Sequence, residues 1–147
     1  MSKITDHFYI SGLDEAHDLR WLKHHHITHI VNCVRGLKNP YPQHFRYISL
    51  NLDDVPNQII YQALEPSYEF IRDALSNGGT VLVHCHAGVS RSASIIIYFL
   101  MKVKGWSYAT ALSYLRTYRP IVNPNPGFVR QLISVSPQVS QIKMNER

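Results

Sequence analysis

The chain has 147 residues, of which 45% are hydrophobic and 17% are charged, and its formal net charge is +5. This length predicts one globular domain over residues 1–147, large enough to bury roughly 68–70% of the surface of the unfolded chain. The composition excludes a repeat or low-complexity protein, and no dense run of Lys or Arg indicates a nucleic-acid arm.

The first half of the chain predicts strands separated by a helix. A short strand is expected at residues 8–10 and a helix over residues 14–25. The β-branched run 28–34 predicts a buried strand. Residues 46–52 alternate polar and apolar side chains, which is typical of a half-buried strand.

The middle of the chain predicts a long helix and a central strand. The helix is expected over residues 59–77 and ends at a pair of glycines. Pro66 lies inside it, so either one helix kinks there or two helices meet, because proline lacks the N–H that a helix interior needs. A strand follows at residues 80–84, and an apolar helix then continues to Lys104 and stops at Gly105.

The last third of the chain predicts two further helices. Ser107 is expected to cap the first, which ends near Arg119. A loop rich in Pro and Asn, residues 122–126, leads to the second. Strands that alternate with helices predict an α/β domain with a largely parallel sheet.

The segment 84–92 reads His-Cys-His-Ala-Gly-Val-Ser-Arg-Ser and lies between the central strand and the following helix. Such a loop can turn its N–H groups inward as an anion site, reinforced by the positive end of the helix dipole. The same field favours a thiolate at Cys85. Arg91 adds a planar guanidinium that can grip two phosphate oxygens.

These residues predict phosphoryl transfer from an ester to sulfur. Cys85 attacks phosphorus, a cysteinyl phosphate forms, and water hydrolyses it. The oxygens would be held by the backbone N–H groups and the side chain of one loop, which comprises His86, Ala87, Gly88, Val89, Ser90 and Arg91. Because these groups carry the charge, we expect no metal and no cofactor.

The leaving oxygen needs a proton, and two neighbouring carboxyl groups could supply it. Asp53 and Asp54 follow a predicted strand and precede a Pro/Asn segment, on a loop that could fold over the anion site. Such an acid contributes about 10²–10⁴-fold to a rate. Ser92 could donate a hydrogen bond to the sulfur and help it to leave phosphorus.

The segment 81–92, VLVHCHAGVSRS, closely resembles the signature of the dual-specificity protein tyrosine phosphatases. The likeness extends over nearly the whole chain, through FYISG at 8–12, ITHIVN at 27–32 and RP at 119–120, and then NPNPGF at 123–128 with Gln131-Leu132. It implies a protein tyrosine phosphatase-like fold, in which a mostly parallel sheet of about five strands has helices on both faces.

The resemblance also implies roles for individual residues. Cys85 is the nucleophile, Arg91 and the loop that precedes it bind phosphate, and Ser92 supports the sulfur. The general acid lies on a loop upstream, where Asp54 precedes Cys85 by 31 positions and Asp53 by 32. In the common pattern the acid is the second of two polar residues after the strand, which favours Asp54.

The family likeness indicates a small, atypical member that consists of the catalytic domain alone. Its expected substrate is a protein phosphorylated on tyrosine, with phosphoserine or phosphothreonine as further options. The loop contains no lysine, unlike that of the phosphoinositide-directed relatives, so a lipid substrate is disfavoured. Asn125 is expected either to bond near the signature loop or to serve a plain turn.

Several other interpretations stay open at this level. A non-catalytic phosphate-binding module, a phosphatase of RNA 5′ ends, lipids or carbohydrates, and a sulfur-transfer enzyme are alternatives. The histidines at 17, 24–26 and 29 match no recognisable zinc spacing. Cys33 is read as a core residue, or as a thiol that could form a protective disulfide with Cys85 under oxidation.

The remaining expectations concern the setting of the protein. Two cysteines do not form a disulfide framework, and the N-terminus lacks the apolar core of a signal peptide. No apolar run is long enough to cross a membrane. We therefore expect a cytoplasmic monomer, with the nucleus as a further location, that binds neither nucleic acid nor membranes.

Overall fold

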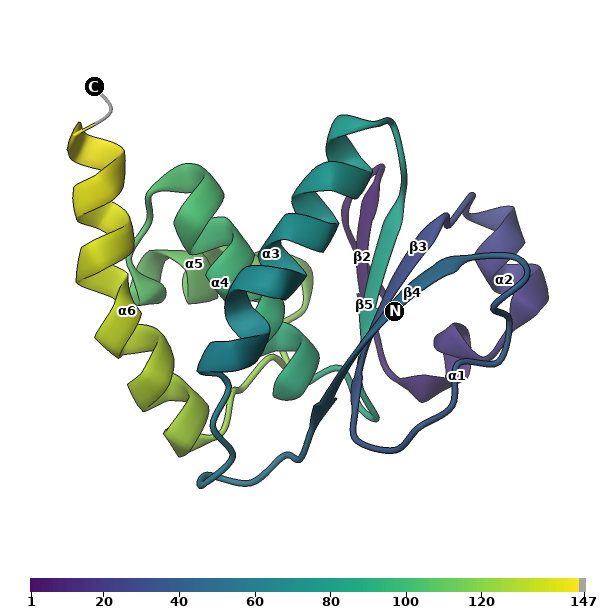
Figure 1. The fold of residues 1–147 in the computed structure, drawn as a ribbon, viewed down its shortest axis with the longest axis horizontal. Coiled ribbons are helices and arrows are strands. Elements are labelled where there is room, and N and C mark those ends of the chain that lie inside the picture. Colours follow the sequence, from purple (N-terminus) through teal and green to yellow (C-terminus); the bar gives the residue numbers. More distant parts are fainter. Residues whose placement is uncertain (146–147) are drawn as a thin grey trace.

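A five-stranded sheet lies in the middle of the molecule, with helices on both sides (Figure 1). The computed structural model describes residues 1–145, and their side chains as far as Ser136. The strand order is β1-β2-β5-β3-β4, and every neighbouring pair is parallel except β1 with β2. The strands are β1 Ser2–Thr5, β2 Phe8–Ser11, β3 His29–Val34, β4 Arg46–Leu52 and β5 Val81–His84.

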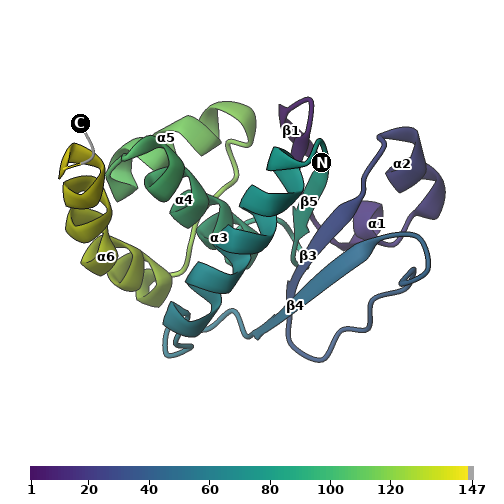
Figure 2. The same ribbon diagram turned by 45° about the horizontal axis from the view of Figure 1, so that its top comes forward.

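The helices divide between the two faces of the sheet, as the views in Figures 1 and 2 show. Two short helices cover one face, α1 Leu13–Ala16 and α2 Leu19–His24. The other face carries α3 Tyr61–Ser76, α4 Arg91–Lys104, α5 Tyr108–Tyr118 and α6 Pro126–Asn145. The predicted α/β architecture, with a mostly parallel sheet and helices on both faces, is confirmed.

The sheet has two apolar faces because successive side chains of a strand point to opposite sides. In β5, Val81 and Val83 belong to the large core that contains the buried side chains of α3 and α4. Leu82, between them, belongs to a smaller cluster with Ile30 of β3 and Leu22 of α2. A strand buried on both faces therefore reads as one continuous apolar run.

Two predictions at the N-terminal end were wrong. Strand β1 was not expected, and it forms because the chain turns after Thr5 and pairs antiparallel with β2. The predicted single helix over 14–25 is two helices. Asp18 has an extended backbone and its side chain accepts a hydrogen bond from the N–H of Trp21, at 3.0 Å, so it caps α2 and ends the first helix.

The other helix boundaries follow their local signals closely. Helix α3 is continuous through Pro66, which lies on its exposed side where water can reach the carbonyl that proline leaves unpaired. Gly105 ends α4 with a φ of +70°, and the Ser107 side chain accepts from the N–H of Thr110 at the start of α5. Among the described residues, no helix has the length and apolarity that a membrane span requires.

Candidate active site

The site residues gather where parallel strands end. Strands β2, β3, β4 and β5 run in the same direction, so their carboxyl ends lie at one edge of the sheet. At that edge β5 leads through Cys85 and residues 86–91, which we call the phosphate loop, into α4. Ligand sites of α/β sheets form at this edge because the loops and helix N-termini converge there.

The tight course of the phosphate loop depends on Gly88. Its φ is +68°, in the left-handed region that favours glycine. A Cβ at this position would lie 2.9 Å from the carbonyl oxygen of Ser11 and 2.8 Å from the guanidinium of Arg119. Glycine is therefore required both for the backbone conformation and for the close approach of β2.

Hydrogen bonds from outside the phosphate loop hold its carbonyl groups. The N–H of Leu13 donates to the carbonyl of His86 at 2.9 Å. Arg119 donates from Nε to the carbonyl of Gly88 at 2.8 Å and from Nη2 to that of Ala87 at 3.0 Å. With its carbonyls bound outside, the loop can turn its N–H groups toward the thiol, and that of Gly88 does so.

The Cys85 thiol is buried and surrounded by donors. The N–H of Gly88 donates to Sγ at 3.2 Å, and Sγ lies 3.1 Å from Oγ of Ser92. Burial alone would raise the pKa of this thiol. The hydrogen bonds from the Ser92 hydroxyl and from the N–H groups of Ser92, Gly88 and Val89 outweigh it, so the pKa of Cys85 is lowered. The predicted place of Ser92 beside the sulfur is confirmed.

Arg91 is buried at the first position of α4. Its Nη1 donates to the carbonyl of Leu52, the last residue of β4, at 2.9 Å. Its Nε is buried and has no hydrogen-bond partner among the described residues. An unpaired buried donor costs about 1–3 kcal/mol, more when charged, and a phosphate oxygen is the acceptor that would satisfy it.

His84 is the last residue of β5, directly before Cys85, and its side chain is buried. Burial lowers the pKa of its imidazole to about 4, although a hydrogen bond to the Cys85 carbonyl works in the opposite direction. The ring is therefore neutral at physiological pH. The contact between Nδ1 and that carbonyl, at 3.4 Å, fits the predicted structural role of His84 next to the loop.

The two candidate acids lie on residues 53–60, which we call the acid loop, and they face different partners. Asp54 accepts a hydrogen bond from Nδ2 of Asn125 at 2.9 Å. The N–H of Asn125 in turn donates to Oγ of Ser90, in the phosphate loop, at 2.9 Å. Asp54 is thus linked through one residue to the anion site. Both roles expected of Asn125 are confirmed, since its N–H bonds to the signature loop and its Oδ1 accepts from the N–H of Phe128 at 3.0 Å in the turn that begins α6.

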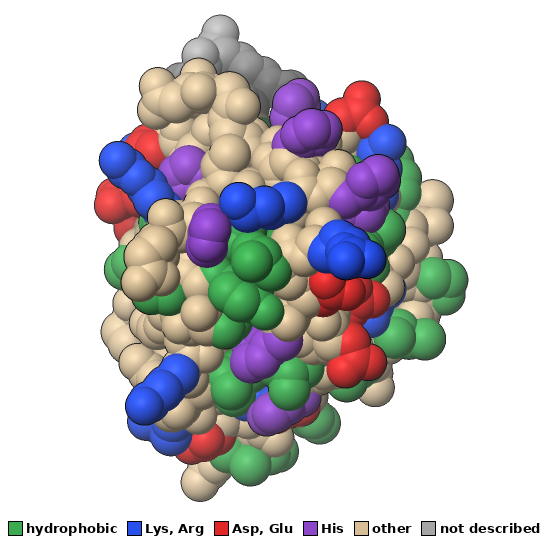
Figure 3. Space-filling view, turned by 90° about the vertical axis from the view of Figure 1, so that its right-hand side faces the viewer, with side chains coloured by type: hydrophobic (Ala, Val, Ile, Leu, Met, Phe, Trp, Pro, Cys, Tyr) green, Lys and Arg blue, Asp and Glu red, His purple; other side chains and the backbone are tan. Residues whose placement is uncertain are grey.

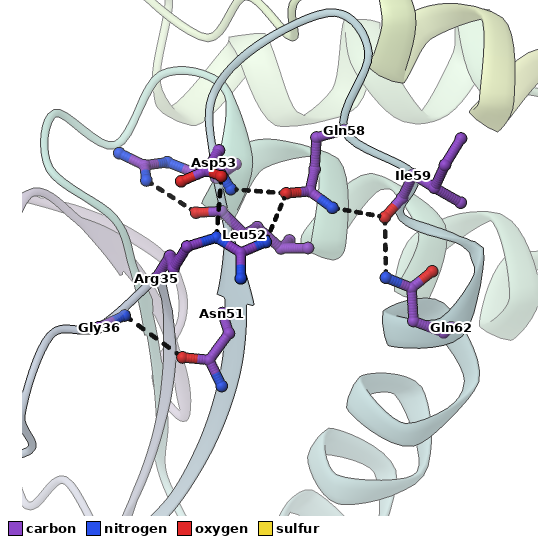
Figure 4. A network of polar contacts seen from close by, with 9 residues as sticks. Arg35, Gly36, Asn51, Leu52, Asp53, Gln58, Ile59 and Gln62 are labelled. Carbon is purple, nitrogen blue, oxygen red and sulfur yellow. Dashed lines mark hydrogen bonds and ion pairs between the residues drawn. The ribbon is translucent and has the colours of Figure 1, made fainter.

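Asp53 is paired with Arg35, the residue after β3 (Figure 4). Nε of Arg35 lies 2.8 Å from Oδ2 of Asp53. The Asp53 carboxylate is thus engaged by the residue that follows β3, whereas Asp54 is linked to the phosphate loop through Asn125. The geometry therefore favours Asp54 over Asp53 as the acid.

Cys33 is fully buried in β3, one residue beyond the Asn32 that pairs with His84. Burial raises the pKa of its thiol, and the neighbouring Cys85 raises it further. Both cysteines are free. A disulfide between them under oxidation stays a prediction.

The histidines do not converge on a single point. Figure 3 shows them dispersed among Lys and Arg side chains on the end of the molecule that carries α1 and α2. Among the described residues, no group of three or more His, Cys, Asp or Glu could hold a metal ion.

Sequence reasoning assigned no role to the residues that hold the acid loop, although Gln131 belongs to the family likeness. Gln131 of α6 accepts from the N–H of Ile60 at 2.7 Å and donates to the carbonyl of Gln58 at 2.8 Å. Arg35 contacts Asp53 and Gln58. These partners are distant in the chain from the loop that they hold, so only the fold reveals the contacts.

Comparisons with known proteins agree with this geometry. The sequence model of the family "Dual specificity phosphatase, catalytic domain" matches residues 8–138. A solved human structure, titled a tyrosine phosphatase-like serine/threonine/tyrosine-interacting protein, superposes with a TM-score of 0.88. It is 36% identical, over 94% of this chain and 96% of that one.

Two curated relatives are longer than this chain. Over 123 residues it is 44% identical to dual specificity protein phosphatase 19 of Mus musculus, covering 84% of this chain and 56% of that protein. Over 129 residues it is 40% identical to a probable rhodanese domain-containing dual specificity protein phosphatase of Dictyostelium discoideum, covering 88% of this chain and 27% of that protein. The chain thus spans about half of one relative and about a quarter of the other.

Proposed function

Since the chain belongs to the family of dual specificity phosphatase catalytic domains, we propose that it is a protein phosphatase. Its substrates are proteins phosphorylated on tyrosine, and also on serine or threonine. The net charge of +5 suits anionic substrates of this kind. The enzyme works as a monomer in the reducing cytoplasm, with access to the nucleus, where its thiol stays reduced.

In the first step the Cys85 thiolate attacks phosphorus, and the bond between phosphorus and the ester oxygen breaks. Asp54 gives its proton to that oxygen, which leaves as the free hydroxyl of the protein. The N–H groups of the phosphate loop and the guanidinium of Arg91 hold the three remaining oxygens throughout the transfer.

In the second step water attacks the cysteinyl phosphate. The ionised Asp54 takes a proton from this water, and the bond between sulfur and phosphorus breaks. The Ser92 hydroxyl, 3.1 Å from Sγ, stabilises the thiolate as it leaves. Phosphate is released, and Cys85 and Asp54 return to their starting protonation states.

One observation carries the proposal. A buried thiol with a lowered pKa lies at the start of a loop whose buried arginine has a donor, Nε, without a partner in the described part of the chain. The arginine can bind a phosphate ester through this N–H, and the thiolate beside it can attack the phosphorus.

Rapid-quench trapping with a ³²P-labelled phosphotyrosyl peptide tests the proposal. We expect acid-stable label on Cys85 within the first turnover and steady release of phosphate. Cys85→Ser should abolish both, while Cys33→Ala, a matched change of the other buried thiol, should keep them.

A wild-type protein that binds the phosphopeptide but never carries label and never releases phosphate would overturn the proposal. That result would leave the non-catalytic phosphate-binding module. Release of phosphate without labelled Cys85 would overturn the assignment of the nucleophile.

A further inference from the structure

Arg35 joins three parts of the chain that meet beside the active site (Figure 4). Its N–H donates to the carbonyl of Leu52 at 3.1 Å, where β4 ends. Its Nε donates to Oδ2 of Asp53 at 2.8 Å, and its Nη2 donates to Oε1 of Gln58 at 3.0 Å. The planar guanidinium thus spans the beginning and the later part of the acid loop at once.

Gln58 is the second point of attachment. The same Oε1 that accepts from Arg35 also accepts from the N–H of Asp53 at 3.0 Å. The N–H of Gln58 donates to the carbonyl of Val55 at 3.1 Å, and its Nε2 donates to the carbonyl of Ile59 at 2.9 Å. These bonds fold the acid loop into a closed turn with Asp54 between its two anchored parts.

The hydrogen bonds among Arg35, Asp53 and Gln58 contribute little to the stability of the fold. The side chains of Arg35 and Asp53 are 53% and 51% exposed, and exposed ion pairs contribute about 0–1 kcal/mol. Every bond of the network, however, restricts where the acid loop lies. Because a misplacement of about 1 Å can cost a reaction about 100-fold, a network of little energetic value can still affect the rate.

The acid loop has little else to hold it at Asp54. Residues 53–57 are exposed, and within the described part of the chain the Asp54 side chain has one hydrogen-bond partner, Asn125. Asn125 approaches from the side of α6, whereas Arg35 approaches from the end of β3. The position of the Asp54 carboxyl therefore depends on restraints from both sides.

We propose that Arg35 is a positioning residue for the general acid, acting through Asp53 and Gln58 to hold the acid loop so that Asp54 stays over the phosphate loop. The proposal rests on the proposed phosphatase function and assigns a use to Asp53, whose role is to pair with Arg35 rather than to donate the proton. Arg35 itself touches neither the substrate nor the sulfur.

The dependence of the rate on the leaving group tests this role. A general acid matters most when the leaving oxygen is strongly basic, as in phenyl phosphate, and least for a strongly electron-poor aryl phosphate. For Arg35→Ala we expect kcat/KM to fall about tenfold with phenyl phosphate and less than about twofold with the electron-poor ester. Asp53→Asn should give the same pattern, and Arg35→Lys, which lacks the planar fork, should lie between.

Arg46→Ala is the matched control, because it removes the same charge from the far end of β4. It should leave both rates within about twofold of wild type, since exposed substitutions away from a site have small effects. Thermal unfolding of each variant verifies that it folds. Alkylation of Cys85 against pH verifies that its thiolate is unchanged.

Equal losses with both esters would overturn the proposal, because a general disturbance of the site does not depend on the leaving group. Unchanged rates for Arg35→Ala would overturn it as well. A much larger leaving-group effect for Asp53→Asn than for Arg35→Ala would make Asp53 the acid itself. All of these outcomes require an active wild type, so they are distinct from failure of the phosphatase proposal, in which wild type releases no phosphate.

Discussion

The phosphate loop and the acid loop lie side by side but are held by different means. The phosphate loop joins a buried strand to a helix whose first eleven residues, 91–101, are all buried. Its carbonyls are bound by Leu13 and Arg119. The acid loop is exposed from residue 53 to residue 57, and it is held by polar side chains, the exposed Arg35 on one side and the buried Gln131 on the other.

This difference separates two requirements of the proposed reaction. The buried strand β5 and the buried start of α4 hold the nucleophile and its hydrogen-bond donors. The positive charge of Arg91, which stabilises the transferred phosphate, is therefore in place before the reaction. The proton donor must reach the leaving oxygens of different substrates, and it lies on a segment with weak individual restraints. Stability and nucleophile chemistry should therefore depend on the phosphate loop, and leaving-group selectivity on the acid loop.

The largest effect should come from the acid itself. We expect Asp54→Asn to lower kcat/KM for phenyl phosphate by about 10²–10⁴-fold, because the amide cannot donate the proton. Steady-state kinetics of wild type and variant measure this loss, and an unchanged kcat/KM would contradict the choice of Asp54.

A glycine offers a way to disturb the acid loop alone. A Cβ on Gly127, at the start of α6, would lie 1.8 Å from the carbonyl oxygen of Pro56, so one of the two backbones must move. We expect Gly127→Ala to lower kcat/KM for phenyl phosphate about tenfold by displacing Asp54. The pKa of the Cys85 thiol, read from iodoacetate alkylation against pH, should not change. A raised thiol pKa would show that the two loops are not independent.

Ser92→Ala is the complementary disturbance of the phosphate loop. Removing the hydroxyl removes one of the bonds that lower the pKa of Cys85, so that pKa should rise. Hydrolysis of the cysteinyl phosphate should slow by roughly 10- to 100-fold, because a hydrogen bond to a charged group contributes about 1.5–3 kcal/mol. Alkylation and single-turnover kinetics measure the two effects. The ratio of rates between phenyl phosphate and an electron-poor ester should stay as in wild type.

The buried His84 should make the stability of the protein depend on pH. Its pKa is lowered from 6.5 to about 4 in the folded protein, so between these values the unfolded chain binds the extra proton. The neutral His84 therefore contributes up to about 3 kcal/mol to the free energy of unfolding. This contribution is fully present above pH 6.5 and is lost as the pH falls toward 4.

Urea unfolding of wild type and His84→Gln at several pH values measures this loss. The variant should lose less stability over the same range, and His86→Gln, which changes an exposed histidine, should behave as wild type. Equal slopes for wild type and His84→Gln would contradict the assignment.

Local sequence patterns by themselves determine many of the secondary-structure elements of this protein and the make-up of its phosphate loop. The apolar run at 81–83, the β-branched run at 28–34 and the caps at Gly105 and Ser107 follow rules that act over a few residues. The signature loop also brings Cys85, Arg91 and Ser92 together through its own short length. Residues within one turn of a helix or one tight loop cannot be far apart, whatever the rest of the chain does.

The family pattern already favoured Asp54 as the acid, and tertiary structure alone decided how that acid is held. Asp53 and Asp54 are adjacent and chemically identical, and what separates them are Arg35 on one side and Asn125 on the other. Arg35 and Asn125 are far from the aspartates in sequence, at distances where no periodic pattern operates. Contacts of that kind depend on the order of strands in the sheet and the packing of α6 against α4, and these are properties of the whole folded chain.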